Sequence, residues 1–447
     1  MQRYSEYTAA PAAWLGDLPS HWDVKKIGSL FSERRTKVSD KDYPPLSVAK
    51  VGVVPQLATA VKTDAGDNRK LVCAGDFVIN SRSDRKGSCG VSELDGSVSL
   101  INIVLTPRDQ WNSRYVHYLM RSHPFSEEYY RNGRGIVSDL WTTRYSEMKS
   151  ILLPIPPHNE QDQIVRFLDW KVSSINRLIA TKKKQIALLH EREAVHSSHI
   201  VVRGLNESVT SRDSGVEWIG DVPAHWETMR CKYLFNERDE RSAEGKEQHL
   251  SMSQKYGLVP DNQLDERRML SESYKGGKLC YQDDLVLNRL KAHLGVFALA
   301  PQLGVISPDY TVLMPNKNRI VPAYAETVLK SIRCRGELRV RVRGIVEGFW
   351  RLYTDDFNTI VLPVPPLGEQ NEIMQYIADY RNSTKAYCDI LSQEIAALQE
   401  LKTRIIFDVV TGQMDVRNVE IPDYEYVDEE PDAVDNNEET EEQEDAE

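Results

Sequence analysis

Apolar residues recur at steps of three and four along two long stretches of this chain that contain neither proline nor glycine. The first stretch runs from about Asn159 to Val202, and the second runs from about Glu369 to Val410. Spacing of this kind predicts amphipathic helices, each roughly 60 Å long. Such a stripe has to be buried, either in the core of its own domain or against the other helix. Because the two stripes match, we expect an antiparallel two-helix coiled coil.

The residues that flank the two stretches are typical of helix ends. A Pro-x-Pro-Pro sequence precedes each stretch, and a Glu-Gln pair follows it at 160–161 and again at 369–370. An acidic side chain in the first turn favours a helix start because it complements the positive end of the helix dipole. Gly204 and Gly412 mark the expected helix ends.

The rest of the chain shows patterns of shorter range. Short apolar segments bounded by Gly, Pro, Asn and Asp predict short strands in both halves. A stretch with helical spacing follows these strands in each half, from Ser113 to Arg131 and from Pro322 to Arg341. We therefore predict an α+β protein in which two repeated α/β domains are separated by the long antiparallel coiled coil.

The two halves carry nearly the same sequence, about 205 residues apart. Residues 14–35 and 218–239 are identical at 10 of 22 positions. Residues 135–168 and 344–377 share a Trp, a Pro-x-Pro-Pro and a Glu-Gln pair. Between these two matched segments, only short stretches of similar sequence remain. This pattern indicates one duplicated scaffold whose ligand-contacting parts differ.

Composition excludes several classes of protein. The 447 residues are enough for two or three domains. The sequence has no apolar run of about 18 residues and no secretory signal, so we expect a cytoplasmic protein without a membrane span. Six scattered cysteines without a Cys-x2-Cys pair indicate reduced thiols, with no disulfide frame or zinc site.

The net charge of −11 comes from the C-terminal segment. Residues 420–447 hold 15 Asp and Glu and no Lys or Arg, whereas the rest of the chain carries a net charge of +4. A segment this acidic and poor in aromatic residues predicts disorder. We interpret it as a solvating tail, with a polyanion that occupies a basic groove as the alternative.

Catalytic motifs are missing from the sequence. It lacks GxxxxGK[ST], Asn-Pro-Pro-aromatic, HExxH and GxSxG. A nuclease centre could be sought in Asp139, Glu147 and Lys149, but the second half has Asn358 where the lysine would stand. We expect no metal site, because Glu193, His196 and His199 of the first long stretch are better explained as solvated or interface residues than as metal ligands.

The order of the motifs resembles that of a known family. Trp-x-Gly-x-x-Pro-x-His-Trp, a variable domain, Pro-x-Pro-Pro-x-x-Glu-Gln and a long helix occur in series twice. Over about residues 4–419 the chain resembles the specificity (S) subunit of type I restriction–modification systems. The segments that the resemblance implies are target-recognition domain 1 at 1–158, a conserved helix at 159–203, a linker and target-recognition domain 2 at 204–367, a second conserved helix at 368–412, and an extension with the acidic tail at 413–447.

The resemblance also implies a function and partners. A specificity subunit binds a bipartite, asymmetric double-stranded DNA target for two methyltransferase (modification) subunits and for restriction–translocase subunits. The chain itself is then non-catalytic and binds no cofactor, while S-adenosylmethionine, ATP and Mg are expected on the partner subunits. Two other functions stay open, a protein–protein scaffold that reads no DNA sequence and a self-contained DNA-modifying enzyme.

Basic and aromatic residues in both halves are the candidates for DNA binding, because cations contact phosphates and forked or planar side chains read base edges. The repeat makes Arg134 equivalent to Arg343, which predicts a shared phosphate contact, and the cations that differ are the better candidates for reading bases. The candidates in the first half are Lys50, Arg82, Arg85, Lys86, Arg134, Trp141 and Arg144. Those in the second half are Lys255, Arg289, Lys291, Arg343, Trp350 and Arg351.

The Glu-Gln pairs have two interpretations. The residues alone predict a turn and a helix start. The resemblance implies in addition that Glu160, Gln161, Glu369 and Gln370 belong to the surface on which the methyltransferase subunits dock.

Overall fold

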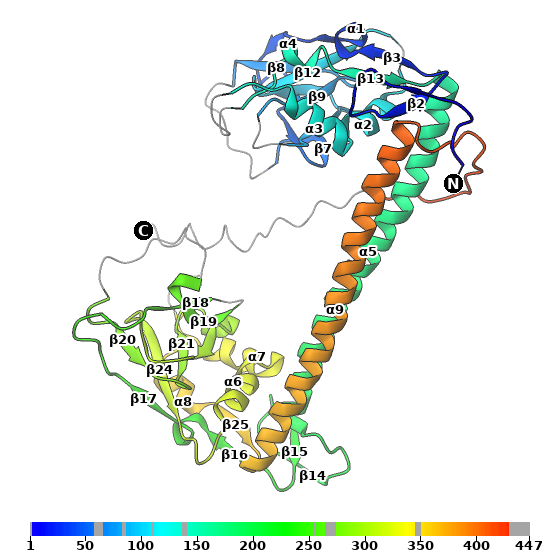
Figure 1. Cartoon of the computed structure of the whole chain (residues 1–447). Helices are drawn as coiled ribbons and strands as arrows, with labels where there is room; N and C mark the ends of the chain where they lie inside the picture. The colour runs from blue at the N-terminus through cyan, green and yellow to red at the C-terminus, as the bar shows by residue number, and fades with distance from the viewer. Residues whose placement is uncertain are drawn as a thin grey trace. The chain divides into compact units, whose positions relative to one another are not determined.

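The computed structural model of the chain describes residues 2–57, 66–82, 86–109, 111–135, 141–253, 256–263, 274–344 and 350–428. The chain forms two compact units (Figure 1). Unit 1 consists of Met1–Lys183 and Leu391–Glu447, and unit 2 consists of Lys184–Ile390. Each long helix therefore contributes one part to each unit.

Short antiparallel strands form the globular part of unit 1. Its largest sheet has the order β10 (Cys89–Val91), β9 (Phe77–Asn80), β12 (Asn102–Pro107) and β4 (Phe31–Glu33). A second sheet contains β11 (Gly96–Val98), β8 (Arg69–Val72) and β5 (Lys37–Val38). The strand pairs are β1 (Tyr7–Ala9) with β2 (Asp17–Pro19), β3 (Asp23–Lys26) with β13 (Leu152–Ile155), and β6 (Leu46–Ala49) with β7 (Gly52–Pro55). The short helices are α1 (Ile27–Leu30), α2 (Ser113–Arg121), α3 (His123–Arg131) and α4 (Tyr145–Met148).

Unit 2 repeats most of this arrangement. Its four-stranded sheet has the order β17 (Phe235–Arg238), β24 (Tyr310–Pro315), β21 (Leu285–Asn288) and β22 (Phe297–Leu299). The strand pairs are β14 (Ser211–Asp213) with β15 (Asp221–Pro223), β16 (Glu227–Arg230) with β25 (Val361–Val364), β18 (Leu250–Ser253) with β19 (Gly257–Pro260), and β20 (Lys278–Cys280) with β23 (Gly304–Ile306). The short helices are η3 (Cys231–Tyr233), η4 (Asp261–Gln263), η5 (Ala292–Leu294), α6 (Pro322–Lys330), α7 (Ile332–Arg341) and α8 (Thr354–Thr359).

Both long helices form where the pattern predicts them. Helix α5 spans His158–Arg203 and helix α9 spans Leu367–Val410 (Figure 1). Gly204 follows α5 with φ +76°, and Gly412 follows α9 with φ +68°. A left-handed backbone of this kind ends a helix and favours glycine, which has no Cβ to clash with the preceding carbonyl.

The two long helices pair in opposite directions within each unit. In unit 1, Lys182 Nζ lies 2.7 Å from Glu394 Oε2, and Lys402 Nζ donates to Asn176 Oδ1 at 3.4 Å. In unit 2, Arg381 Nε donates to Glu193 Oε1 at 2.8 Å, and His196 Nε2 lies 3.2 Å from the Tyr376 hydroxyl. Residue numbers rise along one helix as they fall along the other, so the predicted antiparallel coiled coil is confirmed in each unit.

The helical stretches before the second motif are broken, contrary to the prediction of one helix in each half. Ser122 separates α2 from α3, and Ser331 separates α6 from α7, both with extended backbone angles. The Ser331 hydroxyl accepts a hydrogen bond from the Cys334 amide, which starts the second helix. In unit 1 the following helix has Pro124 in its first turn, where proline is tolerated. The break turns the second helix of each pair in a new direction.

The first residues of the chain contact the segment that follows α9 in unit 1. The Tyr7 hydroxyl donates to the carbonyl of Gly412 at 2.9 Å, and the Asp415 amide donates to the carbonyl of Gln2 at 3.0 Å. In unit 2 the corresponding junction, from Gly204 to strand β14, is one continuous stretch of chain. Hydrogen bonds between these two segments therefore make in unit 1 the connection that unit 2 makes with continuous backbone.

The C-terminal extension is ordered further than its composition predicts. We expected disorder from residue 420, but residues 420–428 lie against α5 in unit 1. Ser173 Oγ donates to the Glu425 carbonyl and accepts from the Val427 amide, and Asn176 Nδ2 donates to the Val427 carbonyl. Tyr426 also receives a hydrogen bond from the Arg114 guanidinium at 2.9 Å. Residues 429–447 of the acidic tail lie outside the described residues.

Candidate nucleic-acid interface

The candidate residues are gathered by a hydrogen-bonded frame that occurs in both units. In unit 1 the Thr143 amide donates to the Ser81 carbonyl at 3.0 Å, just after β9. In unit 2 the Leu352 amide donates to the Arg289 carbonyl at 3.0 Å, just after β21. The frame joins the end of a central strand to the segment that precedes α4 or α8.

A second pair of matched contacts extends this frame. Arg134 pairs with Thr142 as an antiparallel bridge, and Arg343 pairs with Arg351 in the same way. The predicted equivalence of Arg134 and Arg343 is therefore confirmed as a position in the fold. Both side chains are exposed, to 85% for Arg134 and 70% for Arg343, so they can reach a polyanion.

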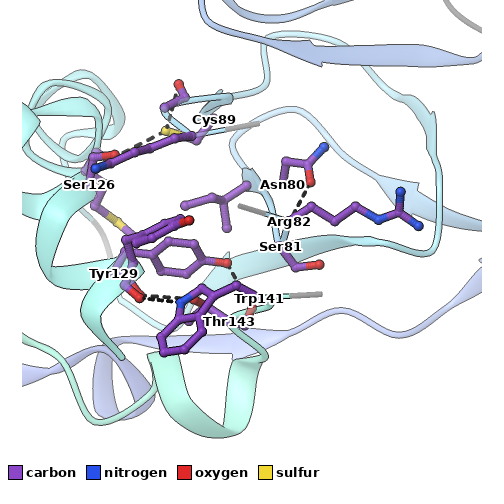
Figure 2. Close-up of a pocket in the computed structure, with 13 residues that line it drawn as sticks. Asn80, Ser81, Arg82, Cys89, Ser126, Tyr129, Trp141 and Thr143 are labelled. Carbon is purple, nitrogen blue, oxygen red and sulfur yellow. Dashed lines mark hydrogen bonds between the residues drawn. The ribbon is translucent and has the colours of Figure 1, made fainter. Parts of the chain in front are cut away.

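Unit 1 gathers four of its predicted residues at this frame. Arg82 forms a bridge with Thr142, so the ends of β9 and α3 meet there. Trp141 donates its indole hydrogen to the Tyr130 carbonyl at 2.9 Å and stacks on the Tyr130 ring. Figure 2 shows the Arg82 side chain extended away from Trp141 and Tyr129. Arg82 and Arg134 are exposed, so both can reach a ligand.

Lys86 stands at the edge of the same group. Its ammonium lies 2.5 Å from Glu127 Oε1 and 4.9 Å from the centroid of the Tyr130 ring. This hydrogen bond from Lys86 holds the pKa of Glu127 below its usual range. Because the two side chains are 40% and 48% exposed, water and salt weaken the pair, and a phosphate can displace the carboxylate.

A small pocket lies between these side chains. Asn80, Arg82, Lys86, Tyr129 and Trp141 are among the residues that line it (Figure 2). The centre of a water molecule can occupy about 10 Å³ of it, which is room for about one water. The pocket therefore cannot enclose a nucleotide base, and any contact with DNA has to be made at its rim.

Unit 2 presents different side chains around the same frame. Trp350 is 39% exposed and meets the His293 ring edge to face at 5.8 Å. Arg289 is held inward by a 3.0 Å hydrogen bond to Thr311, and Arg343 forms an ion pair with Asp356. Two further predicted cations also lie in these segments, Lys291 at the start of η5 and Arg351 in the bridge.

Other predicted residues do not join these groups. Lys50 is exposed in the turn between β6 and β7, where its carbonyl accepts a hydrogen bond from Arg121. Arg144 is exposed at the start of α4 and contacts Glu147 through its amide. Arg85 and Lys255 lie outside the described residues, as does Asp139 of the nuclease alternative.

Sequence reasoning missed Tyr130 in unit 1 and His293 in unit 2, whose rings contact those of Trp141 and Trp350. The sequence marks residues 333–344, with five arginines, as its best basic patch, but it did not single out Arg339 of that patch, which lies near His293. Burial and the nearby Arg339 hold the pKa of His293 below its ordinary value, so its ring is neutral at pH 7. The signal was present in the repeat, because aligning the two proline motifs places Arg339 opposite Tyr130.

The Glu-Gln pairs make their contacts inside the fold. The Glu160 side chain is 3% exposed and accepts hydrogen bonds from Trp22 and His21. Gln161 and Gln370 are also buried, and each donates to a carbonyl of the preceding Pro-x-Pro-Pro sequence. A partner could touch only Glu369, which is 25% exposed, so the docking role remains a prediction for the surrounding surface.

The structure gives no sign of a membrane span or a metal centre in its described part. Among those residues, no helix is both long and apolar enough to cross a membrane. The same residues contain no group of three or more His, Cys, Asp or Glu side chains placed to hold a metal ion. His196 on α5 instead packs on the rings of Tyr376 and Tyr380 of α9.

Two curated proteins of Methanocaldococcus jannaschii are similar to this chain. The putative type I restriction enzyme MjaX specificity subunit is 21% identical over 438 residues, which cover 90% of this chain and 96% of the relative. The type I restriction enzyme MjaVIII specificity subunit is 23% identical over 227 residues, 49% of this chain and 50% of the relative. No protein-family model matches the sequence.

Solved structures of type I restriction–modification proteins are also similar. A chain from a study of complex assembly and conformational transition of the type I R-M system aligns with a TM-score of 0.53 and 16% identity, covering 89% of this chain and 99% of that chain. The HsdS subunit of Thermoanaerobacter tengcongensis aligns with a TM-score of 0.45 and 18% identity, covering 91% and 100%. The first alignment shows a shared fold. Sequence and fold thus confirm the resemblance in the motifs, and this chain is similar over nearly its whole length to the specificity subunits of type I restriction enzymes.

Proposed function

We propose that this chain is the non-catalytic, sequence-specific DNA-binding subunit of a type I restriction–modification complex. In that role it directs methyltransferase and restriction subunits to a bipartite, asymmetric target. Residues 1–158 are target-recognition domain 1, residues 204–367 are a linker and target-recognition domain 2, and the segments 159–203 and 368–412 are the two conserved helices. A subunit that works on chromosomal DNA would act in the cytoplasm.

One observation carries this proposal. The two units share a frame of matched hydrogen bonds, from Thr143 to Ser81 and from Leu352 to Arg289, and present unlike side chains around it. A symmetric protein would match a palindrome, because half-sites mirror the symmetry of the chain that binds them. Equivalent frames with different surfaces instead favour two different half-sites.

The charge distribution supports DNA as the ligand. Lys86, which lies over the Tyr130 ring, and Arg134 and Arg343 are exposed, although each has a carboxylate within 4.0 Å. Phosphates can replace these weak surface partners, and the affinity then falls steeply with salt because counterions are released on binding.

Exposed apolar side chains on α5 and α9 support docking of partner subunits. A long helical pair in water normally covers such residues, and apolar surface that remains open is typical of a protein interface. The exposed large apolar residues of the two helices are Leu178, Leu188, Val195, Leu367, Tyr376, Tyr387, Ile390 and Leu401. S-adenosylmethionine, ATP and Mg would then bind to the methyltransferase and restriction subunits.

A protein–protein scaffold without DNA readout is the alternative. It predicts binding that does not depend on DNA sequence, whereas the proposed function predicts a two-part motif. A self-contained DNA-modifying enzyme would methylate or cut DNA without partners.

The proposal is tested by expressing the chain with its cognate methyltransferase subunits and mapping methylated bases across the host genome. We expect methylation at one interrupted, non-palindromic motif, and none when this chain is omitted. Binding of the purified complex to that motif should weaken at least tenfold on doubling the salt concentration from about 0.1 M, since several phosphates are contacted. Methylation without a motif, or identical methylation in the absence of this chain, would refute the proposal.

A further inference from the structure

We infer that two pairs of equivalent positions set the base preference of the two half-sites, Lys86 and Tyr130 in unit 1 and Leu294 and Arg339 in unit 2. This inference rests on the proposed function and names residues for it. It follows from comparing the side chains at equivalent positions of the two units. Positions that keep their side chain serve both half-sites, and exposed positions that change can distinguish them.

The structure fixes which positions correspond. The strands β9 and β21 hold equivalent places in their sheets, as do β10 and β22. The turns between them contain Gly87 with φ +81° and Gly295 with φ +85°, so Lys86 and Leu294 precede the same backbone feature. Helices α3 and α7 both follow a helix break at a serine, and counting from Ser122 and Ser331 places Tyr130 opposite Arg339.

The constant positions have the properties of a phosphate contact. Arg134 and Arg343 occupy the same bridge, are mostly exposed and carry the same charge. A contact to phosphate gives no sequence information and can be the same in both half-sites. Two unlike half-sites therefore need other side chains close to these arginines.

Unit 1 places an ammonium, a phenol ring and an indole in one row. Lys86 lies over the Tyr130 ring, and the ring stacks on Trp141 with centroids 6.3 Å apart and planes at 28°. The ring positions the ammonium through a cation–π contact. Lysine donates to the O6 and N7 acceptors of guanine, so this row has the chemistry to read a base edge.

Unit 2 replaces both members of that row. Leu294 is 42% exposed where Lys86 stands in unit 1, and it can offer only an apolar contact such as one with a thymine methyl group. Arg339 is exposed and has no carboxylate within 4.0 Å among the described residues. Its fork of donors is free to bind guanine at two points, which is the commonest specific contact of a protein to DNA.

The pocket beside these residues also differs between the units. In unit 1 Ser126 and Gly87 line it. In unit 2 the equivalent of Ser126 is Arg335, whose Cδ lies against Gly295. The aliphatic part of an arginine therefore packs beside the turn glycine in unit 2 where unit 1 has a serine, which makes the two surfaces unlike in shape as well as in charge.

The test exchanges the two positions between the units in the complete methyltransferase complex. One variant carries Lys86→Leu and Tyr130→Arg, and the other carries Leu294→Lys and Arg339→Tyr. The motif of each variant is read by mapping methylated bases, and its affinity is measured on duplexes that differ at single bases. Arg134→Ala and Arg343→Ala are the matched controls, and we expect them to weaken binding to all sequences alike.

We expect each exchange to change the preferred base at one or two positions of one half-site and to leave the other half-site and the spacing unchanged. Discrimination at those positions should change by about 5- to 100-fold, the range of one specific base contact. The single variants Lys86→Met and Arg339→Met alter only exposed side chains and repeat the test if an exchange variant fails to fold. Unchanged base preference in all the folded variants would overturn the inference. A wild-type complex without any motif would instead overturn the proposed function.

Discussion

The buried carboxylate of Glu160 makes several hydrogen bonds whose contribution to the stability of unit 1 can be measured. It accepts hydrogen bonds from the Tyr4 hydroxyl and, at 3.1 Å, from the Trp22 indole, and its other oxygen lies 2.8 Å from His21 Nε2. Burial and the bond to Glu160 raise the pKa of Tyr4 far above its ordinary value, so the hydroxyl stays protonated as a donor. The equivalent Glu369 in unit 2 contacts His225 at 2.8 Å.

Replacing each carboxylate by alanine should have unequal effects. Glu160→Ala leaves two buried donors and a histidine without their acceptor, and removing one partner from such a buried group costs about 3 to 5 kcal/mol. In unit 2 the Trp226 indole nitrogen already lacks a partner among the described residues, and Glu369 is 25% exposed. Glu369→Ala should therefore cost only about 1 kcal/mol, as for a surface ion pair.

Thermal unfolding of the full chain, with hydrogen exchange to assign each transition to a unit, measures both effects. One kcal/mol shifts the Tm of a unit of this size by about 2 to 4 °C. We expect Glu160→Ala to lower the Tm of unit 1 by about 6 to 20 °C and Glu369→Ala to lower that of unit 2 by about 2 to 4 °C. Equal decreases in Tm, or a larger decrease in unit 2, would show that the number of buried donors left without an acceptor does not determine the loss of stability.

Three further predictions concern other features of the units. Burial and nearby arginines lower the pKa of His117 from 6.5 to about 3, so on acidification the unfolded chain binds a proton before the folded chain does. The free energy of unfolding of unit 1 should therefore fall by about 1 to 2 kcal/mol between pH 6.5 and pH 5. Urea denaturation at the two pH values measures this loss, and His117→Gln should abolish it. Gly412→Ala should lower the Tm more than Gly276→Ala, because both glycines have positive φ but only the first would place a Cβ 2.4 Å from a proline ring. Ser173→Ala should speed hydrogen exchange in residues 423–428 about tenfold, because the Ser173 hydroxyl bonds the backbone of that segment. Ser174→Ala should not, because the Ser174 hydroxyl bonds a carbonyl of its own helix.

The long helices were predictable because a periodic signal accumulates over 40 residues and more. Each turn of α5 and α9 repeats the same apolar stripe, and Gly204 and Gly412 end the helices as expected. The break between α2 and α3 has a sequence signal in Pro124, which is tolerated only near the start of a helix, and the prediction of one helix overlooked it. No proline marks the break between α6 and α7, and Ser122 and Ser331 are themselves compatible with a helix interior.

The ordered part of the C-terminal extension was missed for a different reason. Averaging over residues 420–447 hides Tyr426 and Val427 among the acidic residues. The extension is held mainly by hydrogen bonds between its own backbone and the side chains of Ser173 and Asn176. Composition carries no information about such contacts, because the partners lie about 250 residues away.

The candidate interface was predictable as a set of positions and not as a geometry. The repeat identified Arg134 with Arg343, and the bridges of the two units confirm that these positions are equivalent. It could not show that Arg289 is turned inward onto Thr311 or that Lys86 is paired with Glu127. Ion pairs and rotamers of exposed side chains depend on neighbours that are distant in the sequence.

The distribution of identity between the halves has a physical cause. Identical residues such as Arg34 and Arg238 make the same buried ion pairs, with Asp76 at 2.7 Å and Asp284 at 2.8 Å. Loss of one member leaves a charge without its partner in the interior, so both copies resist change. Exposed positions near the shared frame cost little to replace, since surface substitutions usually alter stability by about 0.5 kcal/mol or less. Duplication therefore fixes the residues that fold each unit, and it leaves the rim of the frame as the place where two units with one fold can acquire two different ligands.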